Sequence, residues 1–408
     1  MSSSYSVVTG DTFELIARKL YGDQSGAAAI REANPGVPDP PIVGTVLVIP
    51  DQPSEAAVSP RGPADSPNEV AILIDGRRFR KWSSVTINEA IDQISSVEFT
   101  APFEPDDAAF RDAFRPFSFA TVDIEVNGRR EFTGTLVGVN PSVSPDQSIV
   151  TASCYALPGV LGDCTMPASA FPLEFNNTTL REITAKMLRP FGIRAVFEAD
   201  PGPRFERVGC DPGRTVLDFL ADLARQRNLV IGNDERGSLV FRQSPALGSP
   251  VANLEASPLV SVSPAFNPQQ YFSHITGLEP VTVGLAGSQF TVKNPRLAGS
   301  VRPMTFTVTD ADAGSVSQAV QAKAGRMFAN MVSYSVGLST WRTPAGDLWR
   351  PGSTVNVLAP RAMIYRPYEF EIRGVTRRRE ADSETATLDL IIPGAYAGRV
   401  PEVLPWDD

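Results

Sequence analysis

The sequence has little of the side-chain chemistry that enzymes and metal sites use most. Histidine, the usual general base and metal ligand, occurs once in 408 residues, as His274. The cysteines, Cys154, Cys164 and Cys210, are an odd set whose spacing matches neither a paired disulfide framework nor a zinc site of the CxxC type. We therefore expect reduced and mostly buried cysteines, a structural histidine, no metal and no cofactor.

Long apolar runs and an export signal are also missing. The N-terminal residues MSSSYSVVTGDT have neither a basic opening nor an apolar stretch of signal-peptide length. No run approaches the roughly 18 apolar residues that would cross a bilayer. We expect no membrane span and a protein that is made and assembled in the cytoplasm.

Positive charge is in deficit. Asp and Glu number 46 against 37 Lys and Arg, so the net charge is −9. Such a chain has no broad attraction for phosphate backbones or anionic lipid, and sequence-specific nucleic-acid binding is not expected. If the chain lines a channel, a mildly acidic wall would keep DNA from adhering. The basic runs at 77–81 and 376–380 are interpreted as polar faces of strands.

Catalytic motifs are scarce too. The sequence contains no GxxxxGK[ST] phosphate loop and no GxSxG nucleophile motif. Paired carboxylates serve glycoside hydrolysis only across a cleft. We interpret as solvated turns the pairs Asp106–Asp107, Glu198–Asp200 and Asp407–Asp408. The chain is predicted not to be an enzyme.

The chain is long enough for two to four domains, and its 42% of apolar residues is enough to form their cores. Residues 1–52 form a first unit. A strand-like YSVV precedes an amphipathic run from Phe13 to Tyr21, a short helix is expected near 26–33, and TVLVIP forms a closing strand. The predicted order is strand, helix, helix, strand.

The residues of this first unit resemble the LysM domain. The resemblance rests on YSVVTGDTFELIARKLYGD, IREANPGV and GTVLVIP and covers residues 5–50. It implies a groove that binds peptidoglycan or chitin, or a docking unit such as phage tail proteins carry. The groove candidates are Gly10, Asp11, Thr12, Asn34 and Pro35. Gly and Asn also suit tight turns and Asp or Thr caps helices, so a structural role is equally open.

The remaining chain alternates in character. Residues 53–68 are rich in Pro, Ser and Ala and predict a tether. Short β-branched runs fill 69–155, and Asn127-Gly128 marks a hairpin. Residues 156–245 predict a small α+β domain with helices in 179–193 and from Thr215, and β character returns in 246–408 around a helix at 316–333. The fold class is mainly β with α+β insertions.

Several runs together resemble the baseplate hub proteins of Mu-like and other contractile-tail phages. The resemblance covers residues 69–400 and rests on SCYALPGVLGDCT, TLREITAKMLRPFGI, PGRTVLDFLADLARQRNLVIGNDERGSLVF, GDLWRPGSTVNVLAP and YEFEIRGVTRRREADSETATLDLIIPGAY. It implies two tube-like β-barrel domains in each subunit and a homotrimeric ring of six barrels. Such a ring would adapt a sixfold tail tube to a threefold spike and leave a channel for tape measure and DNA.

The resemblance also implies a place and a set of partners. The place is the tail baseplate of a virion. The implied partners are the central spike protein, a tail tube or tube-initiator protein, the tape measure protein and, through the LysM unit, baseplate wedge proteins or peptidoglycan.

Aromatic residues near the C-terminus are candidates for subunit contacts, because Trp and Tyr dominate interface energetics. The candidates are Trp341, Trp349, Tyr365, Tyr368 and Trp406, each of which could equally be a core residue. The final EVLPWDD is too short to fold alone, and its tryptophan predicts docking on a neighbour.

Two other classes of function stay open at this point. One is a peptidoglycan-binding cell-wall protein with passive β domains. The other is a tail-associated wall hydrolase, in which LysM targets a catalytic domain. The missing export signal weighs against both, and the near absence of histidine weighs against the hydrolase.

Overall fold

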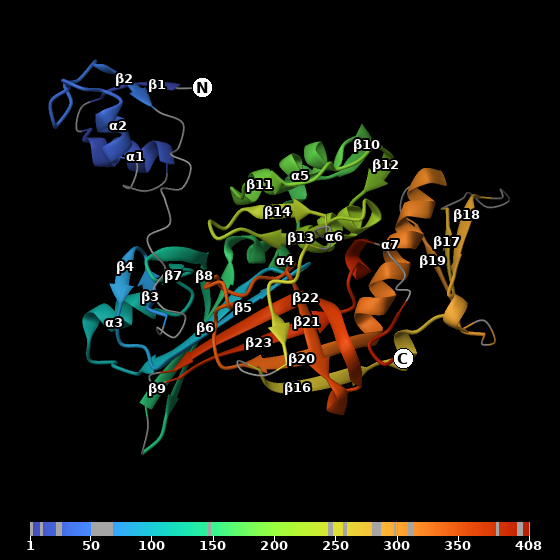
Figure 1. Cartoon of the computed structure of the whole chain (residues 1–408). Coiled ribbons are helices and arrows are strands. Elements are labelled where there is room, and N and C mark those ends of the chain that lie inside the picture. The colour runs from blue at the N-terminus through green and yellow to red at the C-terminus, as the bar shows by residue number, and fades with distance from the viewer. Residues whose placement is uncertain are drawn as a thin grey trace. The chain divides into compact units, whose positions relative to one another are not determined.

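The computed structural model describes most of the chain. The residues described are 3–8, 11–21, 27–49, 68–145, 148–243, 248–255, 259–279, 287–297, 299, 301–308, 313–380, 383–397 and 403–407. The expected tether at 53–68 lies outside them except for its last residue. The chain divides into two compact units, 1–63 and 64–408, which we describe separately (Figure 1).

The N-terminal unit has the predicted order of elements. It consists of β1 (Ser3–Ser6), α1 (Phe13–Tyr21), α2 (Ala27–Glu32) and β2 (Val46–Ile49), and β1 pairs antiparallel with β2. Phe13, Ile16, Ile30 and Leu47 are buried between the helices and the strands. The helical spacing of the run from Phe13 to Tyr21 predicted the part of this core that α1 supplies.

The larger unit is built on one sheet of 13 strands. Its N-terminal half contains β3 (Val70–Ile74), β4 (Arg77–Phe79), β5 (Ser84–Ala90), β6 (Ser96–Pro102), β7 (Thr121–Val126), β8 (Arg129–Val143) and β9 (Ser148–Ala156), with α3 (Ala108–Ala113) between β6 and β7. Its C-terminal half contains β15 (Asn253–Leu254), β16 (Leu259–Phe266), β20 (Val332–Leu338), β21 (Thr354–Ala359), β22 (Ile364–Glu380) and β23 (Glu384–Ile391).

The two halves meet where β5 pairs antiparallel with β22. Ser84 lies opposite Glu380 and Ala90 opposite Gly374. The strand order is β16-β20-β23-β22-β5-β6-β9-β8-β7-β3-β4, with β21 beside β22 and β15 beside β21. Figure 1 shows the blue-green and orange-red strands side by side. The β-rich regions expected at 69–155 and 246–408 are therefore halves of one continuous sheet.

The α+β region between the halves has a core of its own. It contains α4 (Val160–Asp163), β10 (Glu174–Thr178), α5 (Leu180–Leu188), β11 (Ala195–Phe197), β12 (Phe205–Gly209), α6 (Val216–Gln226), β13 (Val230–Asn233) and β14 (Leu239–Arg242). Thr179 and Glu182 form a capping box at the start of α5, and Thr215 caps α6 as the sequence predicted. The amphipathic faces of α5 and α6 bury Ile183 and Phe219.

A long helix and a small sheet complete the unit. Helix α7 (Ala313–Met331) lies against β17 (His274–Leu278), β18 (Gln289–Lys293) and β19 (Pro303–Thr307), which pair in the order β18-β17-β19. The helix was expected at 316–333. It ends at Met331 because the chain continues directly into β20.

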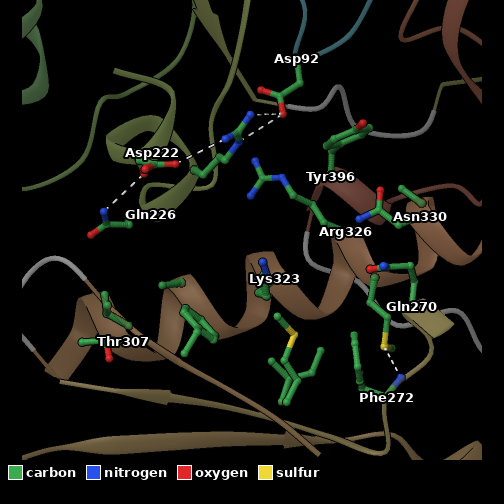
Figure 2. A pocket seen from close by; sticks show the side chains of 18 residues that line it. Asp92, Asp222, Gln226, Gln270, Phe272, Thr307, Lys323, Arg326, Asn330 and Tyr396 are labelled. Carbon is green, nitrogen blue, oxygen red and sulfur yellow. Dashed lines mark hydrogen bonds and ion pairs between the residues drawn. The ribbon is translucent and has the colours of Figure 1, made fainter. Parts of the chain in front are cut away.

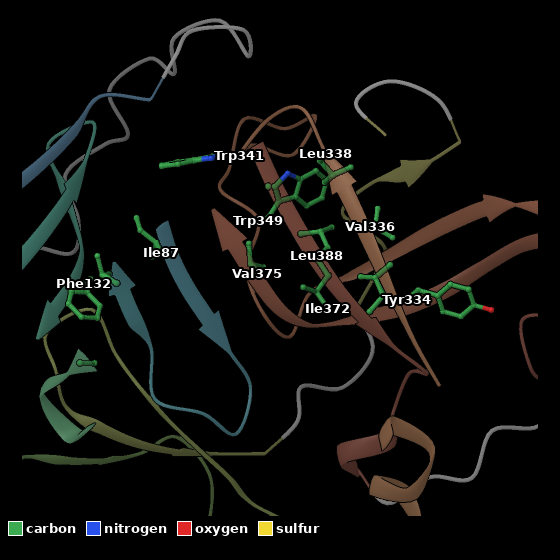
Figure 3. Packing of buried hydrophobic residues seen from close by; sticks show 14 of the residues in the cluster. Ile87, Phe132, Tyr334, Val336, Leu338, Trp341, Trp349, Ile372, Val375 and Leu388 are labelled. Carbon is green, nitrogen blue, oxygen red and sulfur yellow. The ribbon is translucent and has the colours of Figure 1, made fainter. Parts of the chain in front are cut away.

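The main hydrophobic core spans both halves of the sheet and contains two tryptophans. Trp341 and Trp349 are fully buried (Figure 3). The Nε1 of Trp341 donates to the carbonyl oxygen of Thr385 at 2.9 Å, and that of Trp349 donates to Thr340 at 3.1 Å. The indoles thus bury their area and keep a partner for each N–H. The prediction of an interface role is wrong for these two residues, which are core.

Candidate functional site

Strand β16 forms one edge of the large sheet. It pairs with β20 and with no other described strand. All eight of its residues are at least partly exposed, and Val260 has 70% and Phe266 43% of its surface exposed. Its partner β20 buries every second residue. An exposed apolar edge strand offers backbone and side-chain contacts to another chain.

A second exposed apolar feature is the loop between α3 and β7. Phe117 is 91% and Phe119 61% exposed, and both have a left-handed backbone, with φ of 61° and 50°. Bulky residues rarely adopt positive φ, and strain of this kind gathers at functional positions. Neither phenylalanine was singled out from the sequence, where only the pattern RPFSF could have drawn attention.

The seam between the halves of the sheet carries a buried ionic cluster. Arg377 on β22 is fully buried, and its Nη2 donates to Glu89 on β5 at 2.7 Å and to the carbonyl oxygen of Trp349 at 2.6 Å. Arg350 pairs with Glu89 at 3.4 Å and with the buried Glu131 of β8. Two arginines and two glutamates therefore compensate one another across the seam.

The described C-terminal residues, 403–407, pack on their own chain. The ring of Trp406 meets that of Phe266 edge-on, with centroids 5.2 Å apart. The hydroxyl of Tyr368 donates to the carbonyl oxygen of Val403 at 2.9 Å, and burial raises its pKa. Asp407 pairs with Arg296 at 2.8 Å.

The remaining interface candidate, Tyr365, is 48% exposed. Within the single chain, Trp406 packs on Phe266; a contact of Trp406 with a neighbouring subunit stays a prediction. Roles of Tyr365, Tyr368 and Trp406 in subunit contacts stay predictions.

The groove candidates of the N-terminal unit are held by internal hydrogen bonds. Asp11 is buried and accepts from the Tyr5 hydroxyl at 2.9 Å and from the Val8 amide at 3.0 Å, and it pairs with Lys19 at 2.6 Å. The Lys19 ammonium and these hydrogen bonds hold the pKa of Asp11 below its usual value. Thr12 accepts from the Leu15 amide at the start of α1.

Asn34 joins α2 to β2. Its amide donates to the carbonyl oxygens of Ile30 and Val48, each at 2.7 Å, and accepts from the Val48 amide at 2.8 Å. Pro35 is exposed, and Gly10 lies outside the described residues. Asp11 and Asn34 therefore serve the fold of this unit.

Histidine and cysteine take structural places. His274 is half-buried on β17, and its Nδ1 lies 2.9 Å from the Ser273 hydroxyl. All three cysteines are free, and burial raises the pKa of Cys154 to about 12. Within the described ranges, no three His, Cys, Asp or Glu side chains are grouped to hold a metal ion. No helix in the same ranges is long and apolar enough to span a membrane.

Comparison with known proteins supports a tail protein. A family model described as baseplate hub protein gp44-like, second domain, matches residues 158–243. The baseplate hub protein gp44 of Escherichia phage Mu is 22% identical over 316 residues, which span 73% of this chain and 80% of the Mu protein.

Solved structures of tail proteins share the fold. The 43 kDa tail protein of prophage MuSo2 from Shewanella oneidensis superposes with a TM-score of 0.66 at 21% identity and covers 81% of this chain and 99% of its own. A tail protein from Neisseria meningitidis MC58 gives 0.67 at 19% identity, over 82% and 99%. The E. coli type VI secretion component c3393, which is similar to T4 tail proteins gp27 and gp5, gives 0.50 at 14% identity, over 82% and 80%.

The sheet, the inserted α+β domain and these likenesses together define a phage tail protein. More particularly, residues 158–243 match the second domain of gp44-like baseplate hub proteins, and the resemblance to baseplate hub proteins predicted for residues 69–400 is confirmed. Its place is the tail baseplate of a virion. The LysM resemblance of residues 5–50 stays a prediction.

Proposed function

We propose that the chain forms a homotrimeric ring that adapts a sixfold tail tube to a threefold central spike. The observation that carries the proposal is the seam at β5 and β22, which joins two β-rich halves of one polypeptide side by side. Three copies would then supply six such halves around a channel. A closed cyclic assembly is the usual outcome for subunits with complementary surfaces.

The free edges of the sheet support ring closure. Strands β16 and β4 stand at opposite ends of the strand order, so that one end of a subunit can meet the other end of the next. A head-to-tail contact of this kind closes a ring when the rotation is right. Obligate contacts in such assemblies typically bury about 2,000 Å² or more. The exposed Val260, Phe266 and Phe117 are apolar residues available for it.

The role that follows is mechanical. The ring would hold the spike protein on one side and the tail tube or tube-initiator protein on the other, while tape measure and DNA pass through its channel. The net charge of −9 suits a lumen that DNA must not adhere to. We infer no catalytic activity.

Light scattering on the purified full-length chain tests the trimer. We expect a mass near three times 43.9 kDa. Val260→Asp places a charge on the β16 edge and should lower that mass to the monomer value. Val301→Asp makes the same change at a residue with 88% exposure outside the large sheet and should leave the trimer intact. A monomeric wild-type chain at high concentration would contradict the proposal.

We further propose that the N-terminal unit is a LysM-type docking module for baseplate wedge proteins. Its surface exposes aliphatic residues, at fractions of 46% to 65%, on β2 and the preceding loop: Ile42, Val43, Val46 and Val48. Asp11 and Asn34 form hydrogen bonds to groups inside the unit. An apolar face with few free polar groups favours a protein over a glycan.

The alternatives are a peptidoglycan-binding cell-wall protein and a tail-associated wall hydrolase. Sedimentation of the full-length chain with purified peptidoglycan, beside a chain that lacks residues 1–52, distinguishes them. Docking predicts no difference between the two chains. Binding that depends on residues 1–52 would favour the glycan reading, and release of soluble wall fragments would favour the hydrolase.

A further inference from the structure

A basic cavity lies where the α+β domain, α7 and the small sheet meet. Its volume is about 480 Å³. Figure 2 shows the side chains that line it. The apolar part of its lining comes from β17, β19 and the residue after it, α7, and the segment between β16 and β17. It consists of Phe272, Ile275, Met304, Phe306, Val308, Ala319, Met327 and Ala329. The polar part comes mainly from α6, α7, the β5–β6 turn and the 3-10 turn Ala395–Ala397. The lining thus combines apolar and charged side chains.

One of the three cations that line the cavity is already neutralised. Arg225 on α6 pairs with Asp92 at 3.3 Å and with Asp222 at 3.4 Å. These two carboxylates are the only acidic side chains among the described lining residues. Arg225 therefore has little attraction left for a ligand.

The other two cations, Lys323 and Arg326, have no carboxylate within ion-pair distance in the described part of the chain. They lie one turn apart on α7, and Figure 2 shows both pointing into the cavity. The Nη2 of Arg326 donates to the carbonyl oxygen of Leu229 at 3.2 Å, and its Nε is buried without a partner among described groups. Lys323 Nζ lies 5.8 Å from the centre of the Phe306 ring.

We propose that this cavity binds one carboxylate that is attached to an apolar body. Of the three cations that line it, Lys323 and Arg326 have no carboxylate partner among the described residues. The two oxygens of one carboxylate can accept hydrogen bonds from both groups. The apolar lining residues accept the hydrocarbon part of the same ligand. The inference does not depend on the ring.

The pKa shifts of the two cations agree with this assignment. Burial and the charges of Arg326 and Arg225 lower the pKa of Lys323. Burial and the charge of Arg225 likewise lower the pKa of Arg326, although Asp92 opposes the shift. A carboxylate between Lys323 and Arg326 would remove this repulsion and give the buried guanidinium a partner.

Two of the seven methionines of the chain, Met304 and Met327, line the cavity and report on its occupancy. The methionine methyl groups of the full-length chain are isotope-labelled, and their NMR signals are followed while hexanoate, hexanamide or inorganic phosphate is added. The expected result is saturable shifts of Met304 and Met327 with hexanoate alone. Equal shifts with hexanamide, or stronger ones with phosphate, would overturn the proposal.

Matched variants test the cations. Lys323→Gln should raise the dissociation constant of hexanoate about tenfold, because a hydrogen bond to a charged group is lost. Lys186→Gln makes the same change of charge on the exposed face of α5 and should have no effect. Unchanged affinity in Lys323→Gln would contradict the assignment even if hexanoate binds.

A peptide ligand distinguishes a side-chain carboxylate of a protein from a small organic acid. A Leu-Glu-Leu tripeptide blocked at both ends presents a side-chain carboxylate between apolar residues, and its Leu-Gln-Leu counterpart lacks the charge. Shifts of Met304 and Met327 with the first peptide alone identify an acidic segment of a protein as the ligand. Shifts with hexanoate and not with the peptide identify a small organic acid, which has the same chemistry.

Discussion

The seam and the free edge of the large sheet differ in how far their side chains are buried and paired within the chain. At the seam, Arg377 is fully buried and bonded to Glu89 and to the Trp349 carbonyl oxygen. At the edge, β16 exposes Val260 and Phe266 and pairs on one side only. Groups of the same chain satisfy the charges at the seam, whereas at the edge Trp406 covers only part of Phe266 and Val260 stays exposed.

This difference separates contacts that hold one subunit together from contacts left for another molecule. A buried ion pair is safe only when each charge keeps its partner. An exposed edge strand promotes aggregation of a monomer, but it can pair with the next subunit in an assembly. The seam should therefore govern the stability of the subunit, and the edge should govern its association.

The largest expected effect is at the seam. Glu89→Ala leaves the buried Arg377 without its carboxylate and should lower the free energy of unfolding by about 3–5 kcal/mol. Denaturant unfolding of the full-length chain measures it. Glu98→Ala, on the exposed face of neighbouring β6, is the control and should change stability by less than about 0.5 kcal/mol. Equal effects of the two substitutions would remove the distinction.

Tryptophans at the two places sharpen the comparison. Trp349→Ala opens a cavity beside the seam and should cost about 3–5 kcal/mol of unfolding free energy. Trp406 is half-buried and packs on Phe266 at the end of β16, so Trp406→Ala should cost less than half as much. Unfolding midpoints of both variants test this order. A larger loss from Trp406→Ala would mean that the edge, and not the seam, stabilises the subunit.

A smaller effect of opposite sign is expected at the exposed loop after α3. Phe117 has φ of 61°, where a side chain costs about 1 kcal/mol and glycine costs none. Phe117→Gly should raise the stability of the dilute subunit by about that amount and weaken its association. Unfolding at low protein concentration and light scattering at high concentration measure the two effects. A stability loss would show that the phenyl ring serves the subunit itself.

The smallest effect is a local pH dependence in the N-terminal unit. Because the folded pKa of Asp11 is lowered, its contribution to stability is present above its ordinary pKa of 3.8 and is lost as the pH falls through the lower folded value. Hydrogen exchange of residues 3–21 should therefore accelerate below about pH 4 relative to the large sheet. In Asp11→Asn the exchange should be faster at neutral pH and lose this dependence. An unchanged profile would contradict the Tyr5, Val8 and Lys19 network.

Local features of the fold were predictable from the sequence. Thr179 with Glu182 and Thr215 mark the starts of α5 and α6, because their side chains cap the first turn. Asn127 and Gly128 both adopt positive φ, as the hairpin between β7 and β8 requires. Each of these signals lies within a few neighbouring residues.

Features that depend on distant pairing were not predictable. Ala90 meets Gly374 only because β5 and β22 pair, and no local pattern specifies that. Trp349 is buried in a core that contains residues of both halves, so its residue type alone misleads. The pocket at Lys323 and Arg326 likewise depends on where α7 packs against α6. Residues that only the tertiary fold brings together have no characteristic spacing in the sequence.

Electron microscopy of the purified full-length chain tests the ring most directly. The account predicts top views with threefold symmetry, six β-rich densities around an open channel, and loss of these views in Val260→Asp. Single subunits without a channel, at concentrations where the protein is otherwise folded, would contradict it.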